Sequence, residues 1–130
     1  MIVFVDTSAI YALIAADDSN HERAFRASAR LLGEELVTHS YVVVELVSLV
    51  RRRLGPDAAA RLIDEVLPAI EVIDVDASLR SRAISAFRAT TGSAVSLVDR
   101  TSFEFMRQRG IRRAWAMDSD FATEGFELEA

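Results

Sequence analysis

Short apolar runs alternate with segments of helical spacing along most of the chain. The apolar runs predict buried strands over residues 2–5, 36–39, 70–75 and 113–117, with a last strand at 126–129. Apolar side chains that recur every three or four positions predict helices over residues 7–16, 21–33, 41–55, 57–67 and 76–89, and one that begins near residue 96. This order is typical of an α/β fold in which helices cover both faces of a mainly parallel sheet.

Polar residues and glycines mark the expected ends of the helices. Thr7 or Ser8 is the expected N-cap of the first helix and Ser40 that of the third, while Gly33 and Gly55 end the second and third helices. In the second helix a buried apolar face is expected from Ala24, Phe25, Ala27, Leu31 and Leu32.

Length and composition limit the class of protein. The 130 residues suit one domain spanning 1–130, and 51% hydrophobic with 27% charged residues is ordinary for a compact soluble protein. No apolar run approaches the roughly 18 residues that a membrane span needs, and the first residues reach an acid too soon for a signal peptide. The absence of cysteine excludes disulfides, thiolate metal sites and cysteine nucleophiles, and it fits a cytoplasmic location.

Carboxylates follow two of the predicted strands and lie within two of the predicted helices. Asp6 ends the first strand, and Asp118 ends the strand at 113–117, with Asp120 two residues further on. Glu45 lies among Val and Leu residues of the third helix, and Asp99 lies in the first turn of the helix that begins near residue 96. Because ligand sites of parallel sheets form beyond the carboxyl ends of the strands, these acids are expected to converge at one edge.

Each acid also has a purely structural interpretation. Asp6 and Asp118 are suitable helix caps, and Ser96 with Asp99 forms an S-x-x-D capping pair. Capping is impossible in the middle of a helix, so Glu45 would need a buried arginine partner instead.

Converging carboxylates repel one another, and a bound cation is the natural compensation. Without cysteine, and with His21 and His39 both in polar surroundings, the ligands would all be oxygen atoms, which favours Mg²⁺ or Mn²⁺ over Zn²⁺. The reaction that such an ion supports best is hydrolysis of a phosphodiester. Other acid-rich α/β enzymes fit less well, because the chain has no lysine for a receiver domain, no D-x-D after its first strand and no P-loop.

The formal charge of −5 argues against a protein that binds nucleic acid over its whole surface. All fifteen basic residues are arginine, with clusters at 51–53 and 107–113. Arginine suits bidentate contact with phosphate, although solvated helix faces explain the same clusters. Tyr11, Phe103 and Trp115 have apolar neighbours and are expected in the core, where they could not stack on bases.

Three segments carry the acids in a distinctive order. They are IVFVDTSAIYALI at the start, SYVVVELVSLVRRRLG in the middle and SLVDRTSFEFMRQRGIRRAWAMDSDFATEGF at the end. Over nearly the whole chain they resemble the PIN-domain ribonucleases, and within them the VapC-type toxins of toxin–antitoxin pairs. The resemblance implies a PIN-like three-layer sandwich, with a central, mainly parallel sheet flanked by helices.

By position, the resemblance implies an acidic catalytic pocket that holds one or two Mg²⁺ or Mn²⁺ ions. The catalytic residues and metal ligands would be Asp6, Glu45, Asp99 and Asp118, with Asp120 as a further ligand. Thr7 or Ser8 would position a water or phosphate. Arg100, because it adjoins Asp99, is a candidate contact for RNA phosphate, or else it faces solvent.

The resemblance further implies an endoribonuclease that cuts single-stranded or loop regions of tRNA or ribosomal RNA. Such proteins usually form homodimers and are inhibited by a cognate VapB-type antitoxin that blocks the active site. Two alternatives stay open, a PIN nuclease of RNA maturation without an antitoxin and a PIN-like scaffold that binds RNA or protein without cutting. No residue specifies which RNA is cut.

Overall fold

The centre of the computed structural model, which describes residues 1–129, is a five-stranded sheet in which every pair of neighbouring strands is parallel. The strands are β1 (Ile2–Val5), β2 (Glu35–His39), β3 (Glu71–Ile73), β4 (Arg113–Trp115) and β5 (Glu127–Leu128). Their order across the sheet is β3-β2-β1-β4-β5, so the first strand lies in the middle. The predicted parallel sheet is therefore confirmed.

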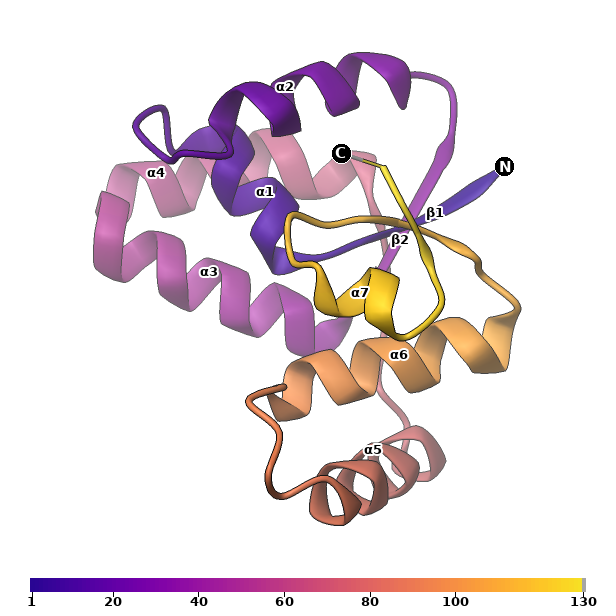
Figure 1. Cartoon of the computed structure of the whole chain (residues 1–130). Coiled ribbons are helices and arrows are strands. Elements are labelled where there is room, and N and C mark those ends of the chain that lie inside the picture. Colours follow the sequence, from indigo (N-terminus) through magenta and orange to yellow (C-terminus); the bar gives the residue numbers. More distant parts are fainter. Residues whose placement is uncertain (130) are drawn as a thin grey trace.

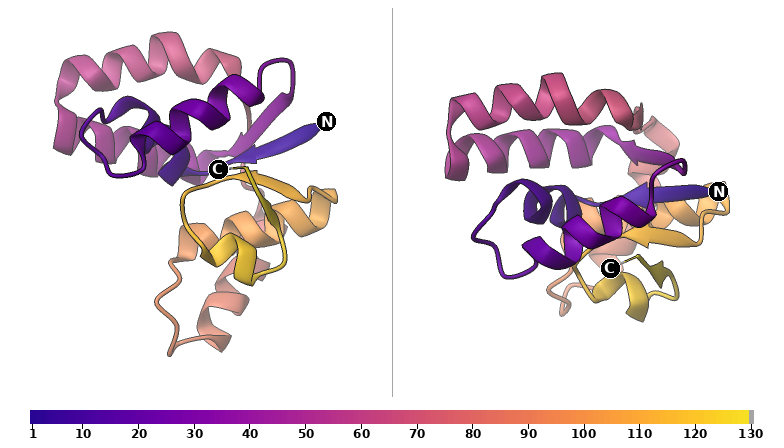
Figure 2. Two further views of the ribbon diagram at one scale, coloured as in Figure 1. Left: turned by 45° about the horizontal axis from the view of Figure 1, so that its top comes forward. Right: turned by 90° about the horizontal axis from the view of Figure 1, so that it is seen from above.

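Helices lie on both faces of this sheet (Figure 1). One layer is formed by α1 (Thr7–Ile14), α2 (His21–Arg30), α3 (Ser40–Leu54) and α4 (Pro56–Arg61). The other layer contains α5 (Ala77–Ala89), α6 (Leu97–Arg109) and the short α7 (Asp120–Thr123), with α5 packed chiefly against α6. In both views of Figure 2, α3 and α4 run side by side. Gly55 is the single residue between these two helices. None of the described helices is both long and apolar enough to cross a membrane.

Two clusters of buried side chains fill the space between the layers. Val3 and Val5 pack in one cluster and Phe4 in the other, because successive side chains of a strand point to opposite faces of the sheet. This explains why β1 is apolar throughout, and it fixes the position of the residues that follow it. The predicted three-layer sandwich is confirmed.

The N-caps of two helices lie one residue before the predicted hydroxyl residues, and the cap of α1 is the acid that was given as the structural alternative. Asp6, not Thr7 or Ser8, caps α1, and His39, not Ser40, caps α3. Both caps keep the extended backbone of the strand that precedes them, so each helix begins directly where its strand ends.

His39 is buried, so the prediction that it has polar surroundings was wrong. Its Nδ1 accepts a hydrogen bond from the Val42 N–H at 3.3 Å, and its Nε2 lies 2.8 Å from Ser102 Oγ. Burial lowers the pKa of His39 to about 4, so the imidazole is neutral at physiological pH. His39 is a structural residue.

The exposed face of α2 also differs from the prediction. Ala24, Ala27 and Leu31 are buried, but Phe25 is 61% exposed and Leu32 is 83% exposed. The three buried positions follow helical spacing, and the other two are rotated by about 100° from that stripe. The buried face of this segment is therefore narrower than the apolar pattern predicts.

The helix predicted over residues 57–67 is divided into three pieces. After α4 the chain forms a π-helical turn (Leu62–Val66) and a 3-10 turn (Leu67–Ala69). The N–H of Leu67 bonds to the carbonyl of Leu62, five residues back. Pro68 has no N–H to donate, so the regular α-helical pattern cannot continue past it.

Candidate active site

A cavity of about 470 Å³ lies beyond the carboxyl ends of β1 and β4, between α3 and α6. Val5 pairs with Trp115 across these strands, and the Asp6 N–H donates to the Trp115 carbonyl at 3.0 Å. The segments that follow β1 and β4 therefore leave the sheet side by side. The lining of the cavity includes Asp6, Glu45, Asp99 and Asp118.

Two hydroxyl groups after β1 orient two of these carboxylates. Thr7 Oγ1 donates to Glu45 Oε1 at 2.6 Å, and Ser8 donates to Asp6 Oδ2 from its backbone N–H at 3.1 Å and from its Oγ at 2.6 Å. The Met117 N–H donates to Ser8 Oγ at 2.9 Å, which joins this segment to the end of β4. Because both hydroxyl hydrogens are engaged by carboxylates, Thr7 and Ser8 can accept a hydrogen bond from water but cannot also donate to a phosphate.

Asp6 keeps one oxygen without a partner. Its side chain is almost fully buried, and Oδ1 has no hydrogen-bond donor among the described residues. Leaving a buried acceptor unpaired is costly unless something outside the chain satisfies it. A hard divalent cation fits this place, because the neighbouring groups are also carboxylate oxygens.

Burial and mutual repulsion raise the pKa values of two cavity acids. Burial, with smaller contributions from Glu45 and Asp118, raises the pKa of Asp6 to about 6 against the opposing hydrogen bonds from Ser8. Burial again, followed by the charges of Asp6, Asp118 and Glu45, raises the pKa of Asp99 to about 7. The cavity therefore holds excess negative charge that a proton or a cation can neutralise.

Asp120 belongs to a second group of acids at the edge of the same site. Oxygen atoms of Asp99, Asp118 and Asp120 all lie within 4.8 Å of one another, a spacing that suits a shared cation. The Asp120 N–H also donates to Asp118 Oδ1 at 2.9 Å. Asp120 begins α7 and does not line the cavity itself, so it lies at the periphery of the site.

The structural interpretations of the acids are partly correct. Asp6 caps α1, and Ser96 Oγ accepts from the Asp99 N–H at 3.1 Å, so both segments are capped as a helix requires. Glu45 has no arginine within ion-pairing distance in the part of the chain that the structure describes. Capping therefore coexists with the acidic cavity, and a structural ion pair does not account for Glu45.

The PIN domain family matches residues 3–126 of the chain. The chain belongs to the PIN-domain family. Over 126 residues it is 36% identical to the 23S rRNA-specific endonuclease VapC20 of Mycobacterium tuberculosis, an alignment that covers 96% of this chain and 95% of that protein. The predicted resemblance to PIN-domain proteins of the VapC type is confirmed.

Several solved structures share this fold. The crystal structure of VapC20, described as a Sarcin-Ricin loop cleaving toxin, has a TM-score of 0.87 and 35% identity, covering 97% of this chain and 96% of that one. VapBC2 of Rickettsia felis, bound to promoter DNA, has a TM-score of 0.73 at 15% identity, covering 98% and 97%. FitAcB of Neisseria gonorrhoeae has a TM-score of 0.70 at 20% identity, covering 98% and 96%. The last two are similar in fold alone.

Arg100 does not reach the acidic cavity of this PIN domain. It is 9% exposed, its Nη1 lies 3.5 Å from Glu124 Oε2, and its guanidinium lies over the ring of Phe103. A direct contact with RNA phosphate does not fit this placement, and neither does a solvent-facing side chain. Glu124 is 24 residues away in the chain, so the local sequence gave no signal for this pair.

The acidic cavity is also lined by residues that the sequence did not predict there. Tyr11 was expected in the core but is only partly buried and lines the cavity, whereas Phe103 and Trp115 are buried as predicted. Arg52, from the arginine cluster at 51–53, lines the cavity too. Its spacing of seven residues from Glu45 was a signal that could have identified it.

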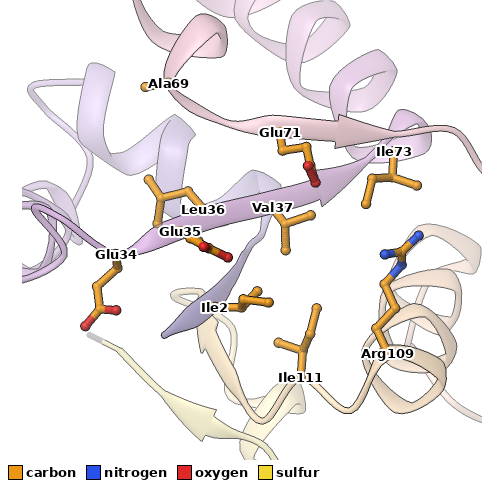
Figure 3. Close-up of a pocket in the computed structure, with 10 residues that line it drawn as sticks. All are labelled: Ile2, Glu34, Glu35, Leu36, Val37, Ala69, Glu71, Ile73, Arg109 and Ile111. Carbon is orange, nitrogen blue, oxygen red and sulfur yellow. The ribbon is translucent and has the colours of Figure 1, made fainter.

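A second cavity, of about 350 Å³, lies toward the amino ends of β1, β2 and β3 (Figure 3). Ile2, Val37 and Ile111 form much of its apolar lining, and Glu71 and Arg109 contribute opposite charges. None of the converging acids lies here. This cavity is therefore separate from the PIN site.

Proposed function

We propose that the protein is a divalent-metal-dependent endoribonuclease and the toxin of a VapBC-type toxin–antitoxin pair. The observation that carries the proposal is that four carboxylates line one cavity and that Oδ1 of one of them, the buried Asp6, has no hydrogen-bond partner among the described residues. A scaffold that only binds RNA has no need for acids that raise one another's pKa. Membership in the PIN-domain family and the similarity to VapC20 support the same function.

The metal is proposed to be Mg²⁺ or Mn²⁺, because every available ligand is an oxygen atom. Its ligands would be Asp6, Glu45, Asp99 and Asp118, with Asp120 at the periphery. Such an ion supplies an activated water and stabilises negative charge on the phosphate and leaving oxygen. Thr7 fixes the orientation of Glu45, and Ser8 fixes that of Asp6, so neither acid must reorganise before reaction.

The proposed substrate is 23S rRNA, cut at its Sarcin-Ricin loop. This rests on the 36% identity to VapC20 along nearly the full length of both proteins. Loops expose unstacked bases and backbone that a cavity at a sheet edge can approach, which a regular RNA helix does not. The proposed site of action is the cytoplasm, where this RNA occurs.

An antitoxin partner is proposed to insert a basic side chain into the acidic cavity. Lys or Arg would neutralise the same carboxylates that hold the metal, so antitoxin and Mn²⁺ should compete. An unchanged Mn²⁺ affinity after addition of the antitoxin would contradict this form of inhibition. A short antitoxin reading frame beside the gene would favour a toxin over a maturation nuclease. We also expect the protein to form a homodimer, by similarity to the VapC-type proteins.

The decisive experiment compares the wild type with Asp6→Asn on purified ribosomes and isolated 23S rRNA in the presence of Mn²⁺. New RNA 5′ ends at one position with the wild type, lost with Asp6→Asn, are the expected result. Asp17→Asn is the matched control, because Asp17 is exposed, lies outside the cavity and undergoes the same change of charge. RNA binding without new ends in the wild type would instead favour the non-cleaving scaffold.

A further inference from the structure

We infer that Arg52 binds an RNA phosphate adjacent to the one that is cut, an assignment that rests on the proposed function. Three consecutive arginines, Arg51, Arg52 and Arg53, occupy the last turn of α3. Of these, Arg52 alone contributes to the lining of the acidic cavity. Arg53 lies over the ring of Tyr11, with 5.5 Å between its Cζ and the ring centroid.

The position of Arg52 follows from the geometry of α3. Glu45, Ser48, Leu49 and Arg52 all line the cavity, and their spacing places them on one stripe of the helix. Seven residues correspond to about 10 Å along the helix axis. Side chains of a helix tend to lean toward its N-terminus, which from Arg52 is the direction of Glu45.

Arg52 is also free to bind an anion from outside the chain. It is exposed, and within residues 1–129 no carboxylate lies within ion-pairing distance of it. By contrast, Arg100 and Arg107 both contact Glu124, and Arg113 contacts Glu34. The guanidinium of Arg52 is therefore not already committed to a partner within the fold.

A role for the helix dipole does not account for this arrangement. Cations near the C-terminus of a helix are favourable, and that effect applies to Arg51, Arg52 and Arg53 alike. It does not explain why Arg52, and neither of its two arginine neighbours, lines the acidic cavity. An RNA strand that enters this cavity meets several negative charges, and a cation at its edge offsets the repulsion while pairing bidentately with a phosphate.

The test uses an RNA hairpin that carries the Sarcin-Ricin loop sequence, bound to the full-length protein in the Asp6→Asn background so that the RNA stays intact. Arg52→Ala should weaken binding about tenfold and reduce the log–log salt dependence by about 0.7, the contribution of one phosphate contact to a single strand. Arg51→Ala, the matched control on the same helical turn, should stay within about twofold of its parent. Arg52→Lys should recover part of the affinity, because it keeps the charge but loses the bidentate geometry.

Cleavage by the same variants in the otherwise wild-type protein separates binding from chemistry. Arg52→Ala should raise KM about tenfold and leave kcat nearly unchanged, because the contact does not involve the reacting phosphate. Equal effects of Arg51→Ala and Arg52→Ala on affinity would overturn the inference, as would a fall in kcat with affinity unchanged. If the wild type bound the hairpin without cutting it, the proposed function would fail, and the affinity comparison would still decide the role of Arg52.

Discussion

Carboxylates at the two ends of the same parallel sheet have opposite electrostatic surroundings. At the amino ends of the strands, Glu34 pairs with the amino group of Met1 at 2.9 Å and with Arg113 at 3.4 Å. The hydrogen bond from the amino terminus, with help from Arg113, lowers the pKa of Glu34. At the carboxyl ends, burial and neighbouring acids raise the pKa values of Asp6 and Asp99.

The difference shows which acids the fold neutralises by itself. Glu34 finds its cations within the chain, so its charge contributes to stability. Among the described residues, Asp6 has two donors from Ser8 for one oxygen and none for the other, so its charge opposes folding in the absence of a cation. Sites that bind ions and catalyse reactions commonly lower the stability of the folded protein.

Replacing a carboxylate of the acidic cavity is expected to have its largest effect on catalysis. Asp118→Asn should lower the cleavage rate about a thousandfold, because the loss of a proposed metal ligand would forfeit several kcal/mol of transition-state stabilisation. Glu34→Gln, which makes the same change of charge at the opposite end of the sheet, should leave the rate within about twofold. Initial rates on 23S rRNA measure both, and equal losses would contradict the assignment of the site. Asp120→Asn should fall between them, because Asp120 lies at the periphery.

Divalent ions should stabilise the protein through the acidic cavity alone. At a Mn²⁺ concentration about 100 times the dissociation constant, the free energy of unfolding of the wild type should rise by about 2.7 kcal/mol. Asp118→Asn should lose most of this gain, whereas Glu34→Gln should keep it. Urea unfolding with and without Mn²⁺, with chelation to test reversal, provides the measurement. A gain that survives in Asp118→Asn would place the metal elsewhere.

Asp6→Asn should make the metal-free protein more stable at pH 8, by about 2–3 kcal/mol, because it removes a buried charge whose pKa is raised to about 6 from an ordinary value of 3.8. A raised carboxyl pKa means that the folded protein binds more protons than the unfolded chain between these two values. The wild type should therefore gain stability as the pH falls through about 6, and its difference from Asp6→Asn should narrow. Unfolding in EDTA from pH 8 to pH 4 follows this difference. A less stable Asp6→Asn protein at pH 8 would show that the cap on α1 matters more than the buried charge.

The smallest effect on stability is expected for Glu34→Gln. Unlike Asp6→Asn, this substitution should destabilise the protein. Its midpoint of thermal unfolding at pH 7 should fall by no more than about 2 °C, since exposed ion pairs contribute little. Because the pKa of Glu34 is lowered from 4.5, its contribution is present above that value and is lost as the pH falls below it. Wild type and Glu34→Gln should therefore converge in stability near pH 3. A midpoint that rises at pH 7 would show that Glu34 is not usefully paired.

Local rules were sufficient for the architecture and for much of the site. Apolar runs identified the strands, and their alternation with helices required parallel connections. Asp6 and Asp118 could be placed together because the carboxyl ends of neighbouring parallel strands meet at one edge, whatever the details of packing. The spacing of Ser96 and Asp99 similarly predicted the start of α6, where Ser96 Oγ accepts from the Asp99 N–H.

Contacts between distant segments decided the rest. Arg100 is buried because Glu124 lies beside it, and Glu45 is oriented by Thr7, 38 residues away. Likewise, the closeness of Tyr11 to the cavity and the burial of His39 depend on how α1, α3 and α6 pack on the sheet. The sequence by itself determined that Asp6 and Asp118, which follow parallel strands, come to one edge of the sheet, since this follows from strand direction. Only the tertiary structure decided which arginine of the 51–53 cluster lines the acidic cavity and which acid oxygen lacks a partner among the described residues, because pairing over a few ångströms depends on side chains brought together by folding.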